Sequence, residues 1–222
     1  MKPIAVIIGV GSGLSASLAR LLSREGYSLV LAARNTDKFA HLTKETGATA
    51  VSLDGSDPAS MRQLFEGLDV APEVVVYNPS ARVRGPLAEV DPEQVRTAVE
   101  VTAFGAFLAG QAAAKRMLAS DPKDGVRGTI LFTGASAGVK GFAHSAPFAM
   151  GKFAQRGLAE SMARELHPKG IHVAWINIDG GIRNPDRPER VDATDNPDSM
   201  LDPDAIARAY LTLIQQDRTA WS

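Results

Sequence analysis

The sequence predicts an α/β fold, a doubly wound parallel sheet with helices on both faces. Apolar runs of strand length alternate with segments of helical period from end to end, which is typical of parallel sheets covered by helices. The chain has 222 residues and shows no internal repeat or linker, so we expect a single domain over 1–222. The predicted strands are 4–8, 28–33, 49–53, 74–77, 129–133 and 172–178.

The first two predicted strands and the segment between them form one βαβ unit. Leucines at positions 14, 18, 21 and 22 repeat at the spacing of one helix face. Gly26 is typical of the residue that follows the end of such a helix. We therefore expect an amphipathic helix that packs on the sheet.

Two longer helices are predicted later in the chain. One begins near Asp91-Pro92, a favourable N-cap and first-turn pair, and runs to about Ala119, while the other covers roughly 147–166. Apolar residues of the first helix, Phe104 and Phe107 among them, spread around more than one face. We therefore expect a homodimer or homotetramer that forms through the two long helices.

A long segment without periodicity, 183–201, precedes the last predicted helix. It is rich in Pro, Asp, Arg and Asn. Loops of this length in compact domains often serve as lids or binding loops, which favours a substrate or lid loop. The composition is equally consistent with surface disorder.

Composition excludes several classes of function. The 24 basic and 25 acidic residues give a net charge of -1 without a basic run, which argues against nucleic acid or an anionic membrane surface as a partner. No apolar stretch reaches the roughly 18 residues of a membrane-spanning helix. The chain has no cysteine and its histidines lack ligand spacing, so we expect no metal site. These observations favour a small-molecule substrate and a cytoplasmic protein.

Three glycines, Gly9, Gly11 and Gly13, stand between the first predicted strand and the helix that starts at Leu14. Glycine lets the backbone approach a phosphate closely, and the free N–H groups at a helix start attract its charge. Together with Ser12, these residues predict a binding site for the phosphates of a nucleotide.

The spacing of these glycines separates three nucleotide-binding patterns. G-x-G-x-x-G would need glycine at Leu14, and the acid-led pattern of methyltransferases would need an acid at Ile7. G-x-x-x-G-x-G fits Gly9 and Gly13, with Ser15 in place of the last glycine.

Four further motifs follow the glycine turn. Asp54 comes just after the third strand, and Asn78 follows the fourth strand within Tyr-Asn-Pro-Ser. Phe-Ala-Met-Gly-Lys ends at Lys152, and Asp-Gly-Gly-Ile occupies 179–182. In this order they resemble the short-chain dehydrogenase/reductase family over nearly the whole chain. That family has Asn-Asn-Ala-Gly, Tyr-x-x-x-Lys and Pro-Gly-x-Ile/Val at the last three places.

The resemblance implies a Rossmann-like domain that binds a nicotinamide cofactor. Asp54 would contact the adenine end, and Gly180 and Ile182 would lie at the nicotinamide amide. Ala33 stands where an acid would bind the free ribose hydroxyl of NAD, while Arg34 beside it can pair with the 2′-phosphate of NADP. We therefore expect NADP rather than NAD.

The resemblance also assigns the catalytic positions, and most of them are altered. Phe148 stands at the tyrosine position, Ala135 at the serine position and Thr102 at the asparagine position, and Lys152 alone is retained. Phenylalanine has no proton to transfer, so the usual mechanism cannot operate as written. Replacement proton donors proposed from spacing are Ser136, His144, Ser145 and Tyr77.

Three functions remain open on the sequence. The first is an NADP-dependent oxidoreductase that acts on a carbonyl or alcohol with an atypical proton donor. The second is a non-catalytic NADP-binding sensor or structural subunit, which explains the altered catalytic positions most simply. The third, a methyltransferase that uses S-adenosylmethionine, rests on the glycines alone. We expect the first.

Overall fold

The computed structural model describes residues 2–221 and contains a six-stranded parallel sheet. The strand order is β3-β2-β1-β4-β5-β6, so the chain reverses its direction of winding between β1 and β4. The strands are β1 Ile4–Ile8, β2 Ser28–Ala33, β3 Thr49–Ser52, β4 Val74–Tyr77, β5 Gly128–Thr133 and β6 Ile171–Ile176. The expected doubly wound sheet is therefore confirmed, and its switch point at β1 and β4 is where such sheets bind ligands.

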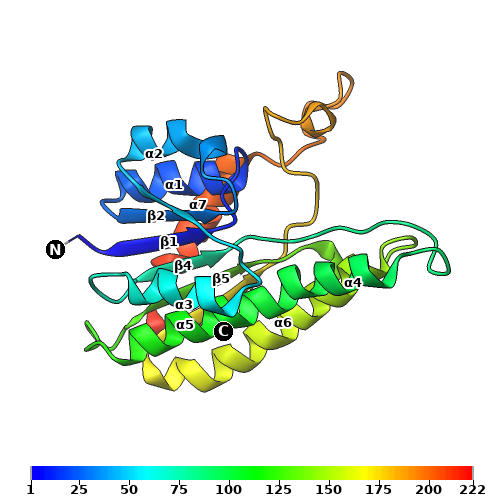
Figure 1. Ribbon diagram of the computed structural model, residues 1–222. Coiled ribbons are helices and arrows are strands. Elements are labelled where there is room, and N and C mark those ends of the chain that lie inside the picture. Colours follow the sequence, from blue (N-terminus) through cyan, green and yellow to red (C-terminus); the bar gives the residue numbers. More distant parts are fainter. Residues whose placement is uncertain (1, 222) are drawn as a thin grey trace.

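Helices cover both faces of the sheet (Figure 1). One face carries α1, α2 and α7, and the other carries α3, α4, α5 and α6. Their bounds are α1 Leu14–Arg24, α2 Ala40–Thr46, α3 Pro58–Glu66, α4 Pro92–Val99, α5 Gly105–Leu118, α6 Ala146–Leu166 and α7 Pro203–Ile214. Short 3-10 turns occupy 37–39, 136–138, 167–169, 188–190 and 218–220.

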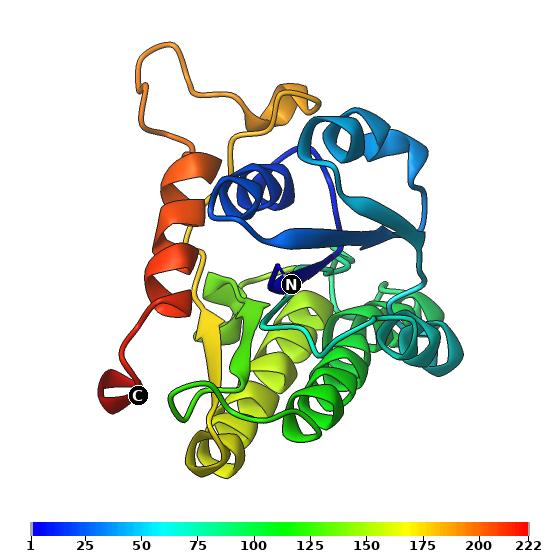
Figure 2. The same cartoon turned by 90° about the vertical axis from the view of Figure 1, so that its left-hand side faces the viewer.

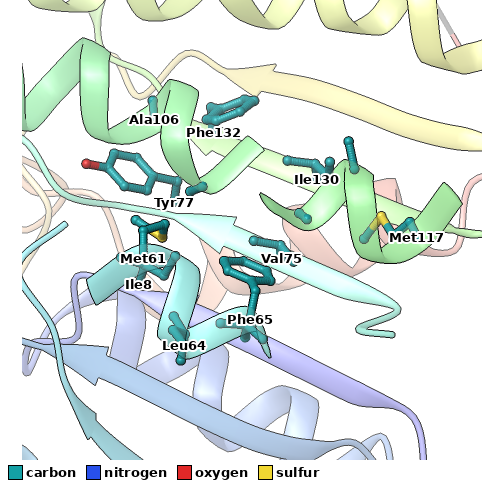
Figure 3. Packing of buried hydrophobic residues seen from close by; sticks show 14 of the residues in the cluster. Ile8, Met61, Leu64, Phe65, Val75, Tyr77, Ala106, Met117, Ile130 and Phe132 are labelled. Carbon is teal, nitrogen blue, oxygen red and sulfur yellow. The ribbon is translucent and has the colours of Figure 1, made fainter. Parts of the chain in front are cut away.

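The strand side chains alternate between two cores. In β4, Val75 and Tyr77 pack with α3 and α5, while Val76 faces the core beneath α1 and α7. Figure 3 shows the first of these cores, with Tyr77 beside Ala106 and Phe65 beneath Val75. Because both faces are buried, the strands read as continuous apolar runs, which is why the sequence identified them.

Some element ends differ from those predicted. The third strand ends at Ser52 rather than Leu53, and the last strand covers 171–176 rather than 172–178. Ile178 is still buried, and its carbonyl accepts from the Ser136 N–H at 3.3 Å. The hydrophobicity of Ile178 therefore reflects packing beyond the strand, which periodicity cannot distinguish from the strand itself.

The first long helix is interrupted where the sequence predicted regularity. Residues Glu100–Phe104 form a π-helical turn that joins α4 to α5. The Tyr77 hydroxyl donates to the Val101 carbonyl at 2.5 Å from the neighbouring strand. Such π turns recur at functional sites, and this one lies beside α6, with which it packs.

The segment 183–201 projects from the body of the protein (Figure 2). Its base is closed by a bridge between Ile182 and Leu201. Its interior is held by an ion pair between Arg183 and Asp192 at 2.6 Å, and Asp192 also accepts from the Met200 N–H at 2.9 Å. The loop is thus ordered by its own polar contacts. Among the described residues, no helix is long and apolar enough to cross a membrane.

Candidate functional site

A cleft of about 530 Å³ opens at the carboxyl ends of β1, β4 and β5. It is bounded by the glycine turn, the segment after β4, the start of α6 and the segment after β6. The lining residues that carry the chemistry discussed below are Gly9, Gly11, Gly13, Leu14, Ser15, Asn78, Arg82, Ala135, Phe148, Lys152, Gly180, Ile182, Asn184, Arg187 and Arg190. The cleft therefore unites segments that are far apart in the sequence.

The glycine turn is held in a conformation that only glycine adopts without strain. Gly9 has φ +84°, and a β-carbon there would lie 2.8 Å from the ring of Pro79. The Ser15 hydroxyl donates to the Gly9 carbonyl at 3.0 Å, and the Asn78 side-chain amide donates to the Ser15 hydroxyl at 2.7 Å. Ser15, in place of the third glycine, thus connects the turn to the end of β4.

The start of α1 can accept an anion. Gly13 is its N-cap and no side chain caps it, so backbone N–H groups of the first turn are available. A β-carbon at Gly11 would meet nothing within 4 Å, so the turn leaves open space at that point. The Ser12 hydroxyl donates to the Asn184 side-chain oxygen at 2.8 Å. Through Asn184, the 183–201 segment reaches the same helix end.

Lys152 lies on the floor of the cleft and is only 2% exposed. Its ammonium donates to the Thr133 carbonyl at 2.5 Å and to the Gln155 side-chain oxygen at 3.1 Å. Burial lowers the pKa of Lys152 to about 7, and the charge of Arg82 acts in the same direction. Lysine has three donors, so one N–H remains beyond these two bonds to meet a ligand.

Gln155 organises the surroundings of Lys152. Its side-chain oxygen also accepts from the Trp175 indole at 3.2 Å, and its amide donates to the Thr102 carbonyl at 3.3 Å. The Thr102 hydroxyl in turn accepts from the Ala81 N–H at 3.1 Å. The π turn is thereby connected to both α6 and the segment after β4. Thr102 is fully buried and positions these elements without lining the cleft.

Phe148, one turn before Lys152 on α6, and Ala135 make part of the cleft lining apolar. With Ala137 they form a small buried cluster, each of the two 7% exposed. The guanidinium carbon of Arg82 lies 4.3 Å from the centre of the Phe148 ring, a cation–π contact. A charged donor therefore covers the ring at the position that the resemblance assigns to the family tyrosine.

Arg34 and Asp54 lie outside the cleft lining. Both are exposed, and the charge of Arg34 helps to lower the pKa of Asp54. The larger cause is Ser56, whose hydroxyl and N–H donate to the Asp54 carboxylate at 2.7 and 2.9 Å. The two residues therefore lie near each other, past the ends of β2 and β3.

The structure brings most of the predicted cofactor residues together in the cleft, and none of the four predicted replacement donors lines it. Tyr77 is fully buried in the core, and burial raises its pKa well above the ordinary value. His144 is exposed, with its carbonyl accepting from the Gly85 N–H. Neither residue lines the cleft, nor do Ser136 and Ser145. Tyr77 in particular binds the π turn rather than facing the site.

Cleft residues that the sequence did not single out include Arg82, Asn184, Arg187 and Arg190. Gln155, which holds Lys152, was also missed. A spacing of three after Lys152 places Gln155 one helical turn away, and this was the available signal for it. No local pattern marks Arg82, since its position depends on where the segment after β4 turns.

Comparison with known proteins places this geometry in a family. The family profile described as short chain dehydrogenase matches residues 3–186. The chain belongs to the short chain dehydrogenase family. Its members are oxidoreductases, and the doubly wound sheet with a glycine turn after β1 agrees with that membership.

Three relatives match most of this chain. The L-2,3-butanediol dehydrogenase of Corynebacterium glutamicum is 26% identical over 191 residues, which cover 78% of this chain and 69% of that protein. A short-chain dehydrogenase structure from Rhodopseudomonas palustris is 33% identical with a TM-score of 0.79, covering 99% of this chain and 95% of that chain. The alcohol dehydrogenase of the archaeon Thermococcus sibiricus, complexed with 5-hydroxy-NADP, is 25% identical with a TM-score of 0.76, covering 97% and 92%.

The cleft has the groups that a dinucleotide needs. The uncapped start of α1 and the open space at Gly11 suit a pyrophosphate. The remaining N–H of Lys152 suits a ribose hydroxyl. Over residues 2–221, no group of three or more His, Asp or Glu side chains could hold a metal ion.

Proposed function

We propose that this chain is an NADP(H)-dependent oxidoreductase that acts on a carbonyl or alcohol substrate with an atypical proton donor. One observation carries the proposal: the glycine turn and the buried Lys152 line the same cleft. A phosphate site and a sugar-binding ammonium in one crevice are what a dinucleotide requires.

Different residues of the site would bind different parts of the cofactor. The N–H groups around Gly11, Gly13 and Leu14 would hold the pyrophosphate, with Ser12 supporting the turn through Asn184. Lys152 would bind the ribose. Gly180 and Ile182 line the cleft where the nicotinamide amide would lie, while Asp54 would lie toward the adenine.

NADP is proposed over NAD because of charge at the end of β2. Ala33 has no carboxylate to accept from a ribose hydroxyl, and Arg34 is an exposed cation that can pair with a 2′-phosphate. The Thermococcus sibiricus relative, which was solved with a hydroxylated NADP, supports the same choice. The bound cofactor supplies the hydride.

Lys152 is the proposed source of the proton. Its ammonium lines the cleft, its one remaining N–H would bind the ribose hydroxyl, and burial lowers its pKa to about 7, so the proton would leave through that same N–H rather than through a separate one. A group with that pKa exchanges a proton readily at neutral pH. Phe148 and Ala135 would then shape the substrate pocket and exclude water, with no part in proton transfer.

The test is NADPH oxidation with a panel of aldehydes and ketones, preceded by thermal-shift measurements with NADPH, NADH and S-adenosylmethionine at equal concentration. We expect stabilisation by NADPH above the other two, and turnover of at least one carbonyl compound. Loss of both binding and turnover in Lys152→Ala would agree with the proposal. If S-adenosylmethionine alone stabilises the protein, the oxidoreductase proposal is wrong and a methyltransferase function takes its place.

A non-catalytic NADP-binding protein is the second candidate, favoured by the apolar cluster of Phe148 and Ala135. The double variant Phe148→Tyr with Ala135→Ser supplies the hydroxyl groups that this wall lacks. If the wild type shows no turnover and the double variant does, the non-catalytic function is correct. A wild type as fast as the double variant would contradict it.

Assembly and the loop complete the proposal. Phe104, Phe107, Met150 and Phe153 are all more than 40% exposed on the long helices, and the first two stack with centroids 6.3 Å apart. An apolar surface of this kind suits a homodimer or homotetramer contact.

The segment 183–201 is proposed as the substrate or lid loop because it contributes Asn184, Arg187 and Arg190 to the cleft.

A further inference from the structure

The wall of the cleft around Phe148 is covered by positive charge. Arg82, in the segment after β4, stacks its guanidinium over the Phe148 ring at 4.3 Å from the centre. Its side chain stays open to solvent on the cleft side. Stacking fixes the plane of the guanidinium while leaving its N–H groups free to bind another molecule.

Two further arginines reach the same cleft from the 183–201 loop. Arg187 and Arg190 line it together with Arg82. The pKa of Arg82 is lowered by partial desolvation and then by the nearby charges of Arg190, Arg84 and Arg187. Segments about a hundred residues apart in the sequence therefore place like charges within electrostatic reach of one another.

These charges are not neutralised within the described chain. No aspartate or glutamate in the described range 2–221 lines the cleft, and none forms an ion pair with Arg82, Arg187 or Arg190. Other arginines do find carboxylates: Arg20 pairs with Glu45 at 2.8 Å, and Arg183 with Asp192 within the same loop. Like charges held together without a counter-charge are unfavourable, and a bound anion removes that cost.

From this arrangement we propose that the substrate carries an anionic group, a carboxylate or a phosphate, next to its reacting carbonyl. Arg82 binds that group against the Phe148 ring, and Arg187 and Arg190 close over it from the loop. The inference rests on the proposed oxidoreductase function and assigns its substrate class. Guanidinium groups bind both anions in a bidentate manner, which orients the carbonyl as well as holding it.

Arg82 and the glycine turn present different donor groups to the cleft. Arg82 stacks on the Phe148 ring, its charge acts on Lys152, and Arg84, Arg187 and Arg190 act on it. The glycine turn is contacted by Pro79 and Asn184. Arg187 and Arg190 lie closer to that turn than their sequence suggests, because both are hydrogen-bonded through their backbones to Asn184. Arg82 is therefore the residue that tests the anionic group apart from the pyrophosphate.

Matched pairs of compounds test the proposal. Benzoylformate against its methyl ester compares a carboxylate with a neutral isostere, and dihydroxyacetone phosphate against dihydroxyacetone does the same for phosphate. Binding to the protein saturated with NADPH is measured by calorimetry at low, fixed ionic strength, and NADPH oxidation is measured separately. We expect at least one anion to bind tenfold or more tightly than its neutral partner, and the pair that shows this identifies carboxylate or phosphate.

Variants locate the effect. Arg82→Met should remove the preference for the anion by tenfold or more while changing the NADPH dissociation constant less than threefold. Arg62→Met, an exposed arginine on α3, is the matched control and should change neither. If Arg82→Met does not fold, as judged by its melting temperature, the double variant Arg187→Met with Arg190→Met on the exposed loop should reduce the preference in the same direction.

The outcomes are distinct. Equal binding of the anionic and neutral partners overturns the anion site, as does an unchanged preference in both arginine variants. Loss of NADPH affinity in Arg82→Met without loss of anion preference assigns the arginine to the cofactor and also overturns it. Anion binding that depends on Arg82 without NADPH oxidation of any compound supports the anion site and defeats the proposed oxidoreductase.

Discussion

The two ends of the cleft are built on different principles. At the glycine turn, neutral groups make every contact: Ser15 and Asn78 tie Gly9 in place, and the uncapped start of α1 offers N–H groups. At the other end, Phe148 and Ala135 provide no polar atom, and charged side chains surround them.

The difference separates a rigid half from an adjustable half. The conformation of Gly9 is held by the short side chains of Ser15 and Asn78, and the loop 183–201 adds one contact to the turn, between Asn184 and Ser12. The Phe148 ring is instead covered by the long side chain of Arg82, and Arg187 and Arg190 reach the cleft from the projecting loop. Nucleotide binding and substrate choice should therefore respond independently to substitution, and the following predictions test that independence.

The largest effect is expected from Gly9→Ala. The new β-carbon would lie 2.8 Å from Pro79 in a backbone with φ +84°, which costs about 2–4 kcal/mol of unfolding free energy. For a chain of this size the melting temperature should fall by about 5–15 °C, measured by calorimetry.

Gly11→Ala is the matched control, because its β-carbon meets nothing within 4 Å. Its melting temperature without ligand should stay within about 2 °C of the wild type. Its NADPH affinity should nevertheless fall, since the added methyl group enters the space left for the pyrophosphate. Equal melting temperatures for the two alanine variants would show that the turn is not constrained as described.

Lys152→Met comes next in size. It removes the N–H proposed to bind the ribose, and a hydrogen bond to a charged group contributes about 1.5–3 kcal/mol. The NADPH dissociation constant should therefore rise by about tenfold or more, measured by fluorescence titration. An unchanged constant would separate Lys152 from the cofactor site. Lys38→Met on the exposed surface is the control.

Arg34→Ser should change the choice of cofactor rather than the strength of binding overall. Loss of the cation at the end of β2 removes a partner for the 2′-phosphate, so the ratio of NADPH to NADH affinity should fall by about tenfold. The preference for anionic substrates should not move, because Arg34 lies outside the cleft lining. A fall in both the ratio of NADPH to NADH affinity and the preference for anionic substrates would mean that the two ends of the cleft are coupled.

The smallest effect concerns pH. Burial lowers the pKa of Lys152 from its ordinary 10.5 to about 7. Between these values the unfolded chain holds a proton that the folded chain has released, so this residue makes stability rise with pH from about 7 toward 10.5. Lys152→Met removes the dependence. Its melting temperature relative to the wild type should therefore be higher at pH 6.5 than at pH 9, by a few degrees, whereas that of Lys38→Met should show no such trend.

The sheet was predictable from the sequence because its strands are buried on both faces and their apolar runs are local. That Gly9, Gly13 and Asn78 would lie together was predictable for a related reason, since they follow the ends of neighbouring strands. The π turn was not predictable, because the hydrogen bond that accompanies it joins Tyr77 to Val101, 24 positions away in the sequence. The same contact places Tyr77 in the core rather than at the nicotinamide face.

Arg82 shows the other limit of sequence patterns. It has no periodic neighbour and no motif, and its role depends on a ring 66 positions later. Arg187 and Arg190 lie in a segment whose composition could not distinguish a binding loop from a disordered one. What placed them was the ion pair between Arg183 and Asp192 together with the bridge at the base of the loop, and neither has a local signal.

The bridge between Ile182 and Leu201 bears on which insertions and deletions the fold tolerates. The Arg183 N–H donates to the Leu201 carbonyl at 2.9 Å, and the Leu201 N–H donates to the Gly181 carbonyl at 2.7 Å. The segment thus leaves and re-enters the domain through adjacent points, and Asp202 caps α7 immediately afterwards. Chain length can be added or removed between these points at a small entropic cost, because loop closure depends only logarithmically on length. The segment proposed as the substrate loop can therefore vary in length and sequence while the sheet beneath the proposed nucleotide site stays the same.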